Sequence, residues 1–195
     1  VGWSGTLISE EYGEDSTWTG GVANLVIDAV NDATPVNFGD IYVSGVTSAS
    51  ATIAAGSKVV QQYGYGEGAG EVYVGSLYWN YSDDYVGDPV AGSSTYNWSY
   101  TATGGPATLI NDGVIGFDGG ADHSGNGVFV EVESITDTTA TLTNNGAIYG
   151  SAQVSSLAVN VNGTTTIVND GDTTEVDTTV ISYTPVGGTA VLTNN

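Results

Sequence analysis

The chain repeats part of its own sequence at an almost constant spacing. Residues 182–195 match residues 99–112, which lie 83 positions earlier, at eight identical positions without a gap. A Gly-Gly-x-Ala-x-Leu core is shared by residues 20–25, 104–109 and 187–192. Self-similarity at a fixed period is the signature of a repeat architecture. The spacing therefore predicts two complete structural units and the start of a third.

The repeat sets the expected boundaries. We expect an N-terminal segment at 1–18, one unit at 19–102 and a second unit at 103–185, followed by the first strand of a third unit at 186–195. A strand without the rest of its unit presents unpaired backbone groups and needs a partner. The sequence therefore indicates assembly before it indicates any chemistry.

The local pattern predicts an all-β protein. Helical periodicity is nearly absent, and short runs rich in Val, Ile, Thr and Tyr alternate with Gly, Asn and Asp. The expected strands include 157–161 and 165–168 as two separate strands. About six strands in a unit of about 84 residues fit an immunoglobulin-like β-sandwich. We therefore favour tandem sandwich units.

A second periodicity predicts a different architecture. Asn144, Asn169 and Asn194 are spaced by 25 residues, as are the apolar residues two positions before them. A step of this size is typical of a β-solenoid whose asparagines form a ladder inside the turns. The 25-residue match is confined to residues 139–195, whereas the longer repeat crosses both halves. The solenoid is therefore the second interpretation.

The charge of the chain excludes several partners. Twenty-two acidic residues face a single lysine, Lys58, and one histidine, with no arginine, for a formal net charge of −21. Nucleic-acid binding requires cations that neutralise phosphates, so we expect no nucleic-acid partner. No apolar run approaches the roughly 20 residues that cross a bilayer, so we expect no transmembrane segment.

The composition is typical of an exported protein. Cysteine is absent, so a disulfide framework and a thiolate metal site are excluded. The chain begins at Val1 and is rich in Gly, Thr, Ser, Asn and Val, which fits a mature secreted product whose targeting segment was removed. We expect an extracellular or cell-surface location.

Acidic clusters are candidate cation sites. Calcium requires several oxygen ligands, which Asp118 with Asp122, and Asp170 with Asp172, could supply. The alternative is that Asn-Asp-Gly-Asp simply forms a tight turn. His123 follows Asp122, and we interpret it as a solvated loop histidine. We therefore expect no catalytic residue, no enzyme activity and no required cofactor, with calcium as a candidate ligand.

Aromatic residues concentrate in the first unit. Exposed tryptophans such as Trp79 and Trp98 can stack on sugar rings, which makes glycans candidate partners, although packing against other strands is the simpler interpretation. Sequons for N-glycosylation occur at Asn80, Asn97 and Asn162. They predict glycan attachment if the source organism glycosylates exported proteins.

Two short segments carry a resemblance to a known class of proteins. Residues 181–185, Ile-Ser-Tyr-Thr-Pro, and residues 139–146, Thr-Ala-Thr-Leu-Thr-Asn-Asn-Gly, are similar to strand ends in the repeat modules of prokaryotic secreted surface proteins, both adhesins and extracellular filament subunits. This resemblance implies a structural or adhesive role and no catalytic residue.

These observations predict an exported structural subunit that assembles head to tail with copies of itself. The product would be an extracellular filament, a pilus-like fibre or a surface array formed by exchange of terminal strands. The apolar residues expected to fill pockets in the neighbouring copy are Trp3, Leu7, Ile8, Ala190 and Leu192. The alternative is an adhesin or carbohydrate-binding module that uses the aromatic face of the first unit.

Overall fold

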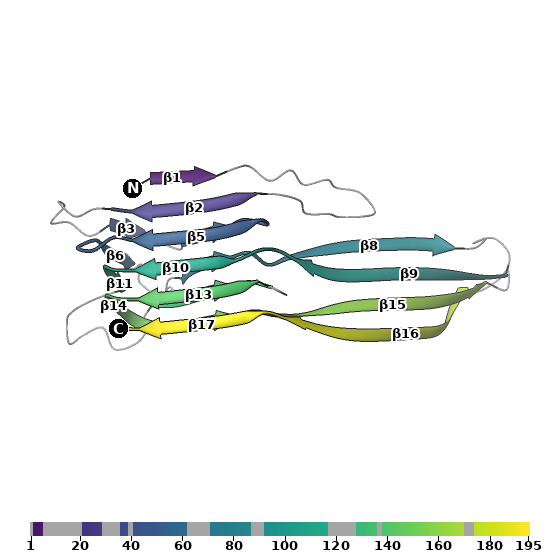
Figure 1. The fold of residues 1–195 in the computed structure, drawn as a ribbon. Helices are drawn as coiled ribbons and strands as arrows, with labels where there is room; N and C mark the ends of the chain where they lie inside the picture. Colours follow the sequence, from purple (N-terminus) through teal and green to yellow (C-terminus); the bar gives the residue numbers. More distant parts are fainter. Residues whose placement is uncertain are drawn as a thin grey trace.

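The computed structural model describes residues 2–5, 21–28, 36–38, 41–61, 71–86, 92–116, 128–135, 138–169 and 174–195. All regular structure within these segments is β-strand, so the all-β prediction is confirmed. The molecule has two parts (Figure 1). One is a pile of mostly parallel strands, which we call the stack. The other is a four-stranded sheet that projects from one end of the stack, which we call the arm.

A six-stranded sheet forms one side of the stack. The strand β1 pairs antiparallel with β2, and every later neighbour in this sheet pairs in parallel. In order, the sheet contains β1 (Gly2–Gly5), β2 (Val22–Ile27), β5 (Ser48–Ile53), β10 (Ala107–Asn111), β13 (Thr139–Asn144) and β17 (Thr189–Asn194).

A seven-stranded parallel sheet forms the other sides of the stack. Its central strand, β14, pairs with β11 through its first residues and with β12 through its later ones, so the sheet has two halves that meet in β14. In order, the sheet contains β3 (Val36–Phe38), β6 (Lys58–Gln61), β11 (Val114–Gly116), β14 (Ala147–Ser155), β12 (Val128–Glu133), β7 (Glu71–Gly75) and β4 (Ile41–Ser44).

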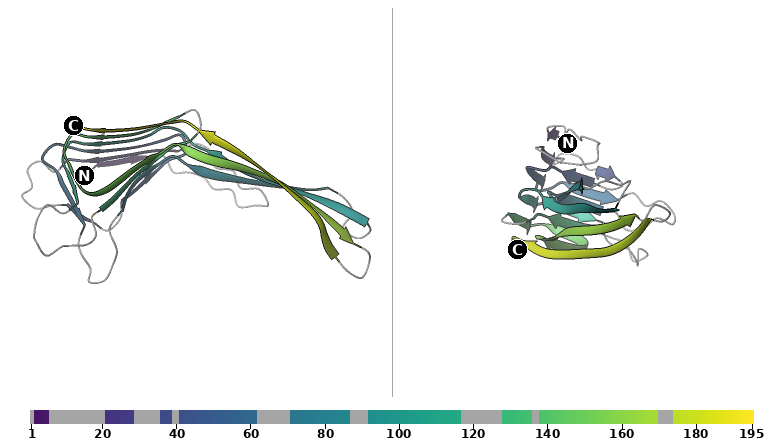
Figure 2. Two further views of the ribbon diagram at one scale, coloured as in Figure 1. Left: turned by 90° about the horizontal axis from the view of Figure 1, so that it is seen from below. Right: turned by 90° about the vertical axis from the view of Figure 1, so that its right-hand side faces the viewer.

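The chain builds these sheets in successive passes. The strands β2, β3 and β4 form the first pass, β5 to β7 the second, β10 to β12 the third, and β13 with β14 the fourth. Each pass lies beside the previous one, as the end-on view in Figure 2 shows. Because the pairing is parallel and in register, equivalent positions of successive passes fall into columns.

The columns that point inward form the core. Leu109 pairs with Leu142, which pairs with Leu192, and Ala107 with Ala140 forms the neighbouring column. Leu109 and Leu142 are almost fully buried. Alternating burial along β5, β10, β12 and β13 shows that every second side chain enters this core. The sequence repeat is therefore the repeat of a stacked core.

Buried serines mark the corner where the second, third and fourth passes return to the six-stranded sheet. Ser76, Ser134 and Ser156 directly follow β7, β12 and β14, and all three are buried. Ser134 Oγ donates to Ser156 Oγ over 2.9 Å, and Ser76 Oγ donates to the Gly45 carbonyl over 2.6 Å. These hydrogen bonds give each buried hydroxyl a partner, which avoids the free-energy cost of burying an unpaired polar group.

The arm grows from this corner. One hairpin, β8 (Tyr78–Val86) with β9 (Gly92–Thr103), follows Ser76, and the other, β15 (Leu157–Asn169) with β16 (Thr174–Gly187), follows Ser156. The first hairpin returns to the third pass and the second hairpin leaves the fourth pass at the same corner. As a result β9 pairs with β15 and one antiparallel sheet forms, in the order β16-β15-β9-β8.

The paired glycines of the sequence repeat stand where each hairpin re-enters the stack. A Cβ atom at Gly105 would lie 1.8 Å from the Thr47 carbonyl oxygen, and one at Gly188 would lie 2.2 Å from the Thr138 carbonyl oxygen. Only glycine fits between backbones this close. The spacing of about 84 residues thus corresponds to two passes of the stack plus one hairpin.

Tandem immunoglobulin-like sandwiches are not confirmed. Sandwich sheets pair antiparallel strands, whereas the stack pairs parallel ones. The expected boundary between residues 102 and 103 falls inside β9, and β5 of the first expected unit pairs with β10 of the second. The described strands of the two units therefore share all three sheets.

The terminal strand has a partner within the chain, contrary to expectation. β17 pairs in parallel with β13 along its whole length, and β1, from the expected segment 1–18, pairs with β2. The last repeat is thus the next strand of an existing sheet. Only one edge of β17 lacks a described neighbouring strand.

Candidate functional site

The arm separates its side chains by chemistry onto two faces. Successive residues of a strand point to opposite faces, and directly paired residues share a face. Tyr81 of β8 pairs with Tyr100 of β9, and two positions further on Asp83 pairs with Trp98. We call this side the aromatic face. Its members are Trp79, Tyr81, Asp83, Tyr96, Trp98, Tyr100, Gly163, Ile181 and Tyr183.

The rings of this face contact one another. The centroids of Tyr81 and Tyr100 are 4.9 Å apart, and those of Trp98 and Tyr100 are 5.9 Å apart with the rings edge to face. Both separations lie in the range of favourable aromatic pairs. The three rings therefore form one connected cluster across β8 and β9.

A carboxylate holds two phenols of the face in place. The Asp83 Oδ2 atom accepts a hydrogen bond of 2.7 Å from the Tyr96 hydroxyl and one of 3.1 Å from the Tyr81 hydroxyl. The two hydroxyls also contact each other. The hydrogen bonds to Tyr81 and Asp83 raise the pKa of Tyr96, so its phenol stays protonated at neutral pH.

Gly163 makes room for the indole of the cluster. It pairs with Trp98 across β15 and β9, and a Cβ atom at this position would lie 2.1 Å from Trp98 Cε2 and Cζ2. The indole therefore leans over the neighbouring strand where a side chain is missing. This packing fixes the indole of Trp98 against β15, where the ring is half-buried.

The opposite face of the arm is polar and carries all three sequons. Asn80, Asn97 and Asn162 lie there together with the Ser or Thr two positions after each. The Thr164 hydroxyl donates to Asn97 Oδ1 over 3.0 Å. Because a sequon spaces its asparagine and hydroxyl residue by two, both fall on one strand face. Whether these asparagines carry glycans stays a prediction.

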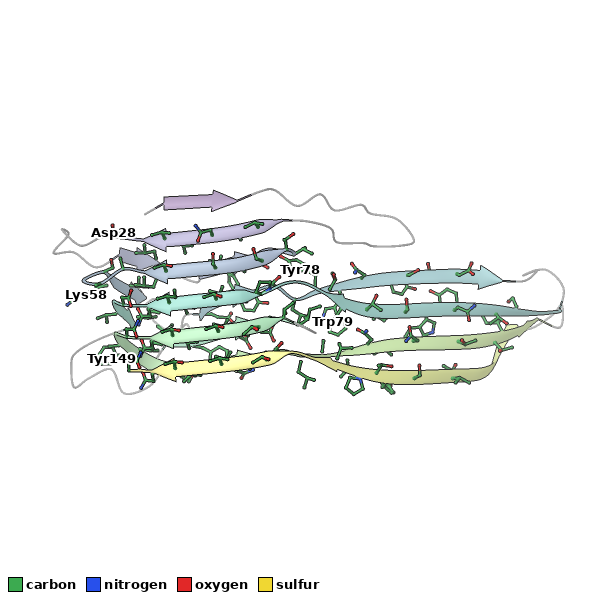
Figure 3. All side chains as sticks on the ribbon, viewed as in Figure 1. Asp28, Lys58, Tyr78, Trp79 and Tyr149 are labelled. Atoms are coloured by element: carbon green, nitrogen blue, oxygen red, sulfur yellow. The ribbon has the colours of Figure 1, made fainter. Side chains whose placement is uncertain are left out.

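The aromatic face is uncovered in the structure. The arm continues away from the stack as a single layer of strands (Figure 2). Trp79 and Tyr100 are 41% and 42% exposed, and Tyr183 is 65% exposed. Trp79 lies at the base of the arm, whereas Lys58 lies at the far end of the stack (Figure 3).

A second candidate surface is the outer edge of β17. The Thr189 and Asn195 amides donate to the carbonyls of Thr138 and Asn144. Because amides alternate in direction along a strand, those of Ala190, Leu192 and Asn194 point to the open side. Every residue of β17 is exposed. This edge can accept a further strand.

The structure places the predicted residues unevenly. Trp79 and Trp98 share the aromatic face, and Ala190 and Leu192 lie on β17. Trp3 lies in β1 at the opposite edge of the six-stranded sheet. The remaining candidates lie outside the described residues, namely Leu7, Ile8, Asp118, Asp122, His123, Asp170 and Asp172. In the part of the chain that is described, no three His, Cys, Asp or Glu residues gather into a metal-binding group.

Sequence reasoning missed two residues of the aromatic face, Asp83 and Gly163. Asp83 accepts hydrogen bonds from Tyr81 and Tyr96, and Gly163 makes room for Trp98. The signal available in the sequence was the alternation of aromatic and polar residues in 78–85 and again in 96–100. Together the two runs predict a hairpin with one aromatic face.

Comparison of the chain with protein-family models, with curated proteins and with solved structures finds no match. Among the described residues, no helix has the length and apolar character needed to span a membrane. Function must therefore be argued from the geometry of the arm and of the open edge.

Proposed function

We propose that this chain is an exported structural subunit that assembles head to tail through the open edge of its stack. The product would be an extracellular filament or surface array. The proposal rests mainly on one observation, the outward amides of β17 on a strand whose residues are all exposed. An edge of this kind is a template for another strand.

The core residues at this edge support the proposal. Leu109 and Leu142 are 0% and 1% exposed, but Leu192, next in the same column, is 53% exposed. A further strand would remove this apolar surface from water, which favours association.

The arrangement of the two sheet edges favours an open assembly. In the six-stranded sheet β1 stands at one edge and β17 at the other, and they run in opposite directions. An edge of β17 that meets β1 of the next copy would pair antiparallel. Contacts between two different surfaces are heterologous and extend without limit unless they close into a ring.

We interpret the stack as a β-solenoid. Parallel strands in register, repeated inward columns and a buried asparagine ladder support this interpretation. In such an assembly the six-stranded sheet of one copy would continue into the six-stranded sheet of the next. Because the chain carries a net charge of −21, copies repel one another, so salt and calcium would promote assembly.

Substitution of one outward amide tests the proposal. Ala190→Pro removes an amide on the open side of β17 and leaves the bonds to β13, because proline is tolerated at a free strand edge. Ala190→Ser keeps the amide and is the matched control. We expect fibres of wild type and Ala190→Ser in negative-stain electron microscopy with calcium and added salt. Ala190→Pro should remain monomeric in sedimentation velocity.

Two results would count against head-to-tail assembly. One is fibre formation by Ala190→Pro at the wild-type rate. The other is a wild-type chain that stays monomeric at every salt and calcium concentration. A circular dichroism spectrum shared by all three proteins would show that the proline acts on assembly and not on folding.

An adhesin or carbohydrate-binding module is the second candidate function. The observation that favours it is the uncovered ring cluster of the arm, which no assembly through β17 uses. The two functions are compatible, because the surfaces lie on different sheets.

A further inference from the structure

The aromatic face lacks the second layer that a one-sided apolar sheet normally packs against. Sheets with one apolar face bury it against another element. Here Trp79, Tyr100 and Tyr183 are each more than 40% exposed, and Ile181 is 43% exposed. A contiguous exposed patch of large apolar side chains is typical of an interaction site.

The charges around this face restrict its partner. The strands of the arm contain no Lys, Arg or His, and the only lysine of the chain lies at the other end of the stack (Figure 3). Anionic glycans, nucleic acids and anionic lipids would therefore meet only acidic groups.

A second copy of the chain also fits this face poorly. Two aromatic faces packed together would bury Asp83 of both copies with no cation of the arm to pair with either. Burial of a carboxylate without a countercharge is unfavourable, which opposes the packing of two such faces. The partner is therefore expected to carry no negative charge.

The rings are held in place before any partner arrives. Asp83 fixes the Tyr81 and Tyr96 phenols, and Gly163 seats the indole of Trp98. Ring faces held in advance lose little conformational entropy on binding. The Tyr81 and Tyr96 hydroxyls donate their protons to Asp83 and can still accept hydrogen bonds from a ligand.

Building on the second candidate function given above, we propose that the aromatic face binds a neutral oligosaccharide chain. Pyranose rings present apolar C–H faces that stack on Trp98 and Tyr100, and their hydroxyl groups match the phenol hydroxyls. An uncharged sugar avoids the repulsion that excludes the other partners. Asp83 is a positioning residue in this site, because it acts through the two phenols that it holds.

The test uses three neutral hexasaccharides as probes: cellohexaose, chitohexaose and xylohexaose. Hexagalacturonate is the anionic comparison and polylysine the cationic one. Binding is measured by isothermal titration calorimetry and by tryptophan emission, at protein concentrations where sedimentation velocity shows monomers. Monomers keep the result independent of assembly through β17.

Four variants locate the site. Trp98→Ala and Tyr100→Ala remove rings, and Gly163→Ala displaces the indole without removing it. Tyr149→Ala removes a tyrosine that is 44% exposed on the stack and is the matched control. We expect at least one neutral hexasaccharide to bind saturably, with affinity at least tenfold lower in the three arm variants and unchanged in Tyr149→Ala.

Several results would overturn the proposal. These are no binding of any neutral hexasaccharide, binding that survives in both Trp98→Ala and Tyr100→Ala, and binding of hexagalacturonate or polylysine alone. A dimer that the same two variants abolish would assign the face to a second copy instead. Because Tyr100 is 42% exposed, its variant stays informative even if Trp98→Ala fails to fold.

Discussion

A column of amides replaces a column of isoleucines within one sheet. Asn111 Nδ2 donates a hydrogen bond to Asn144 Oδ1, and Asn144 Nδ2 donates one to Asn194 Oδ1. Both donor–acceptor distances are 2.7 Å. In the first two passes Ile27 and Ile53 occupy the same column. A buried amide needs partners, so a single asparagine among isoleucines would be costly. The amides are therefore tolerated because they follow one another.

Removal of the middle amide tests this interpretation. We expect Asn144→Ala to lower the free energy of unfolding by about 2 kcal/mol, because it leaves buried hydrogen-bonding groups without partners and creates a small cavity. The adjacent Asn145 is exposed and donates to Asp112 Oδ1. Asn145→Ala should change stability by less than about 0.5 kcal/mol. Equal losses in urea denaturation would show that the buried ladder has no special role.

At the scale of elements, both hairpins of the arm leave the stack at equivalent corners. Ser134 leads directly into the next pass, whereas a hairpin follows Ser156 and returns at Gly188, whose amide donates to the Ser156 carbonyl over 2.9 Å. The hairpin thus begins and ends at nearly the same point. The stack does not need the hairpin to place β17.

Replacement of residues 157–187 by Ile-Thr-Asp, the sequence of 135–137, should leave the stack folded. The remaining hairpin β8–β9 would lose its β15 neighbour, and an isolated two-stranded hairpin is marginally stable in water. Hydrogen exchange should therefore show loss of protection in β8 and β9, with β5, β10 and β13 unchanged. Loss of protection throughout the stack would mean that the arm supports it.

The sequence predicts most strands but not their arrangement. Residues 107–110, 139–143 and 189–192 are strands as expected, because alternation of apolar and polar residues reports burial on one face. The same alternation occurs in parallel and antiparallel sheets, so it does not separate a sandwich from a stack. That distinction depends on pairing between distant segments.

Two local errors have physical causes. The pattern splits β15 at Asn-Gly-Thr, because glycine is typical of turns, whereas Gly163 is a strand residue that accommodates Trp98. The 25-residue period places Asn169 in the asparagine ladder, whereas Asn169 ends β15 of the arm and Asn111 takes part instead. Of the candidate site, the aromatic side chains could be read from the alternation, but their contact with Gly163 could not.

At the scale of the whole molecule, the net charge of −21 has a local consequence on the seven-stranded sheet, where three glutamates meet. Glu131 accepts a hydrogen bond of 3.3 Å from Gln153, and Glu71 and Glu133 lie near it. Burial, and then the charges of Glu133 and Glu71, raise the pKa of Glu131. The folded protein therefore binds this proton more tightly than the unfolded chain does, so ionisation of Glu131 opposes folding.

Glu131→Gln should stabilise the protein at pH 7 and not in acid. The wild-type carboxyl favours folding below its unfolded pKa of about 4.3 and loses that advantage as pH rises through the higher folded value. We expect the thermal midpoint of Glu131→Gln to exceed that of wild type by about 1–3 °C at pH 7 and to match it near pH 3.5. Gln153→Glu, which adds a carboxylate beside Glu131, should lower the midpoint at pH 7 only. A gain for Glu131→Gln that persists unchanged at pH 3.5 would assign the effect to packing instead of charge.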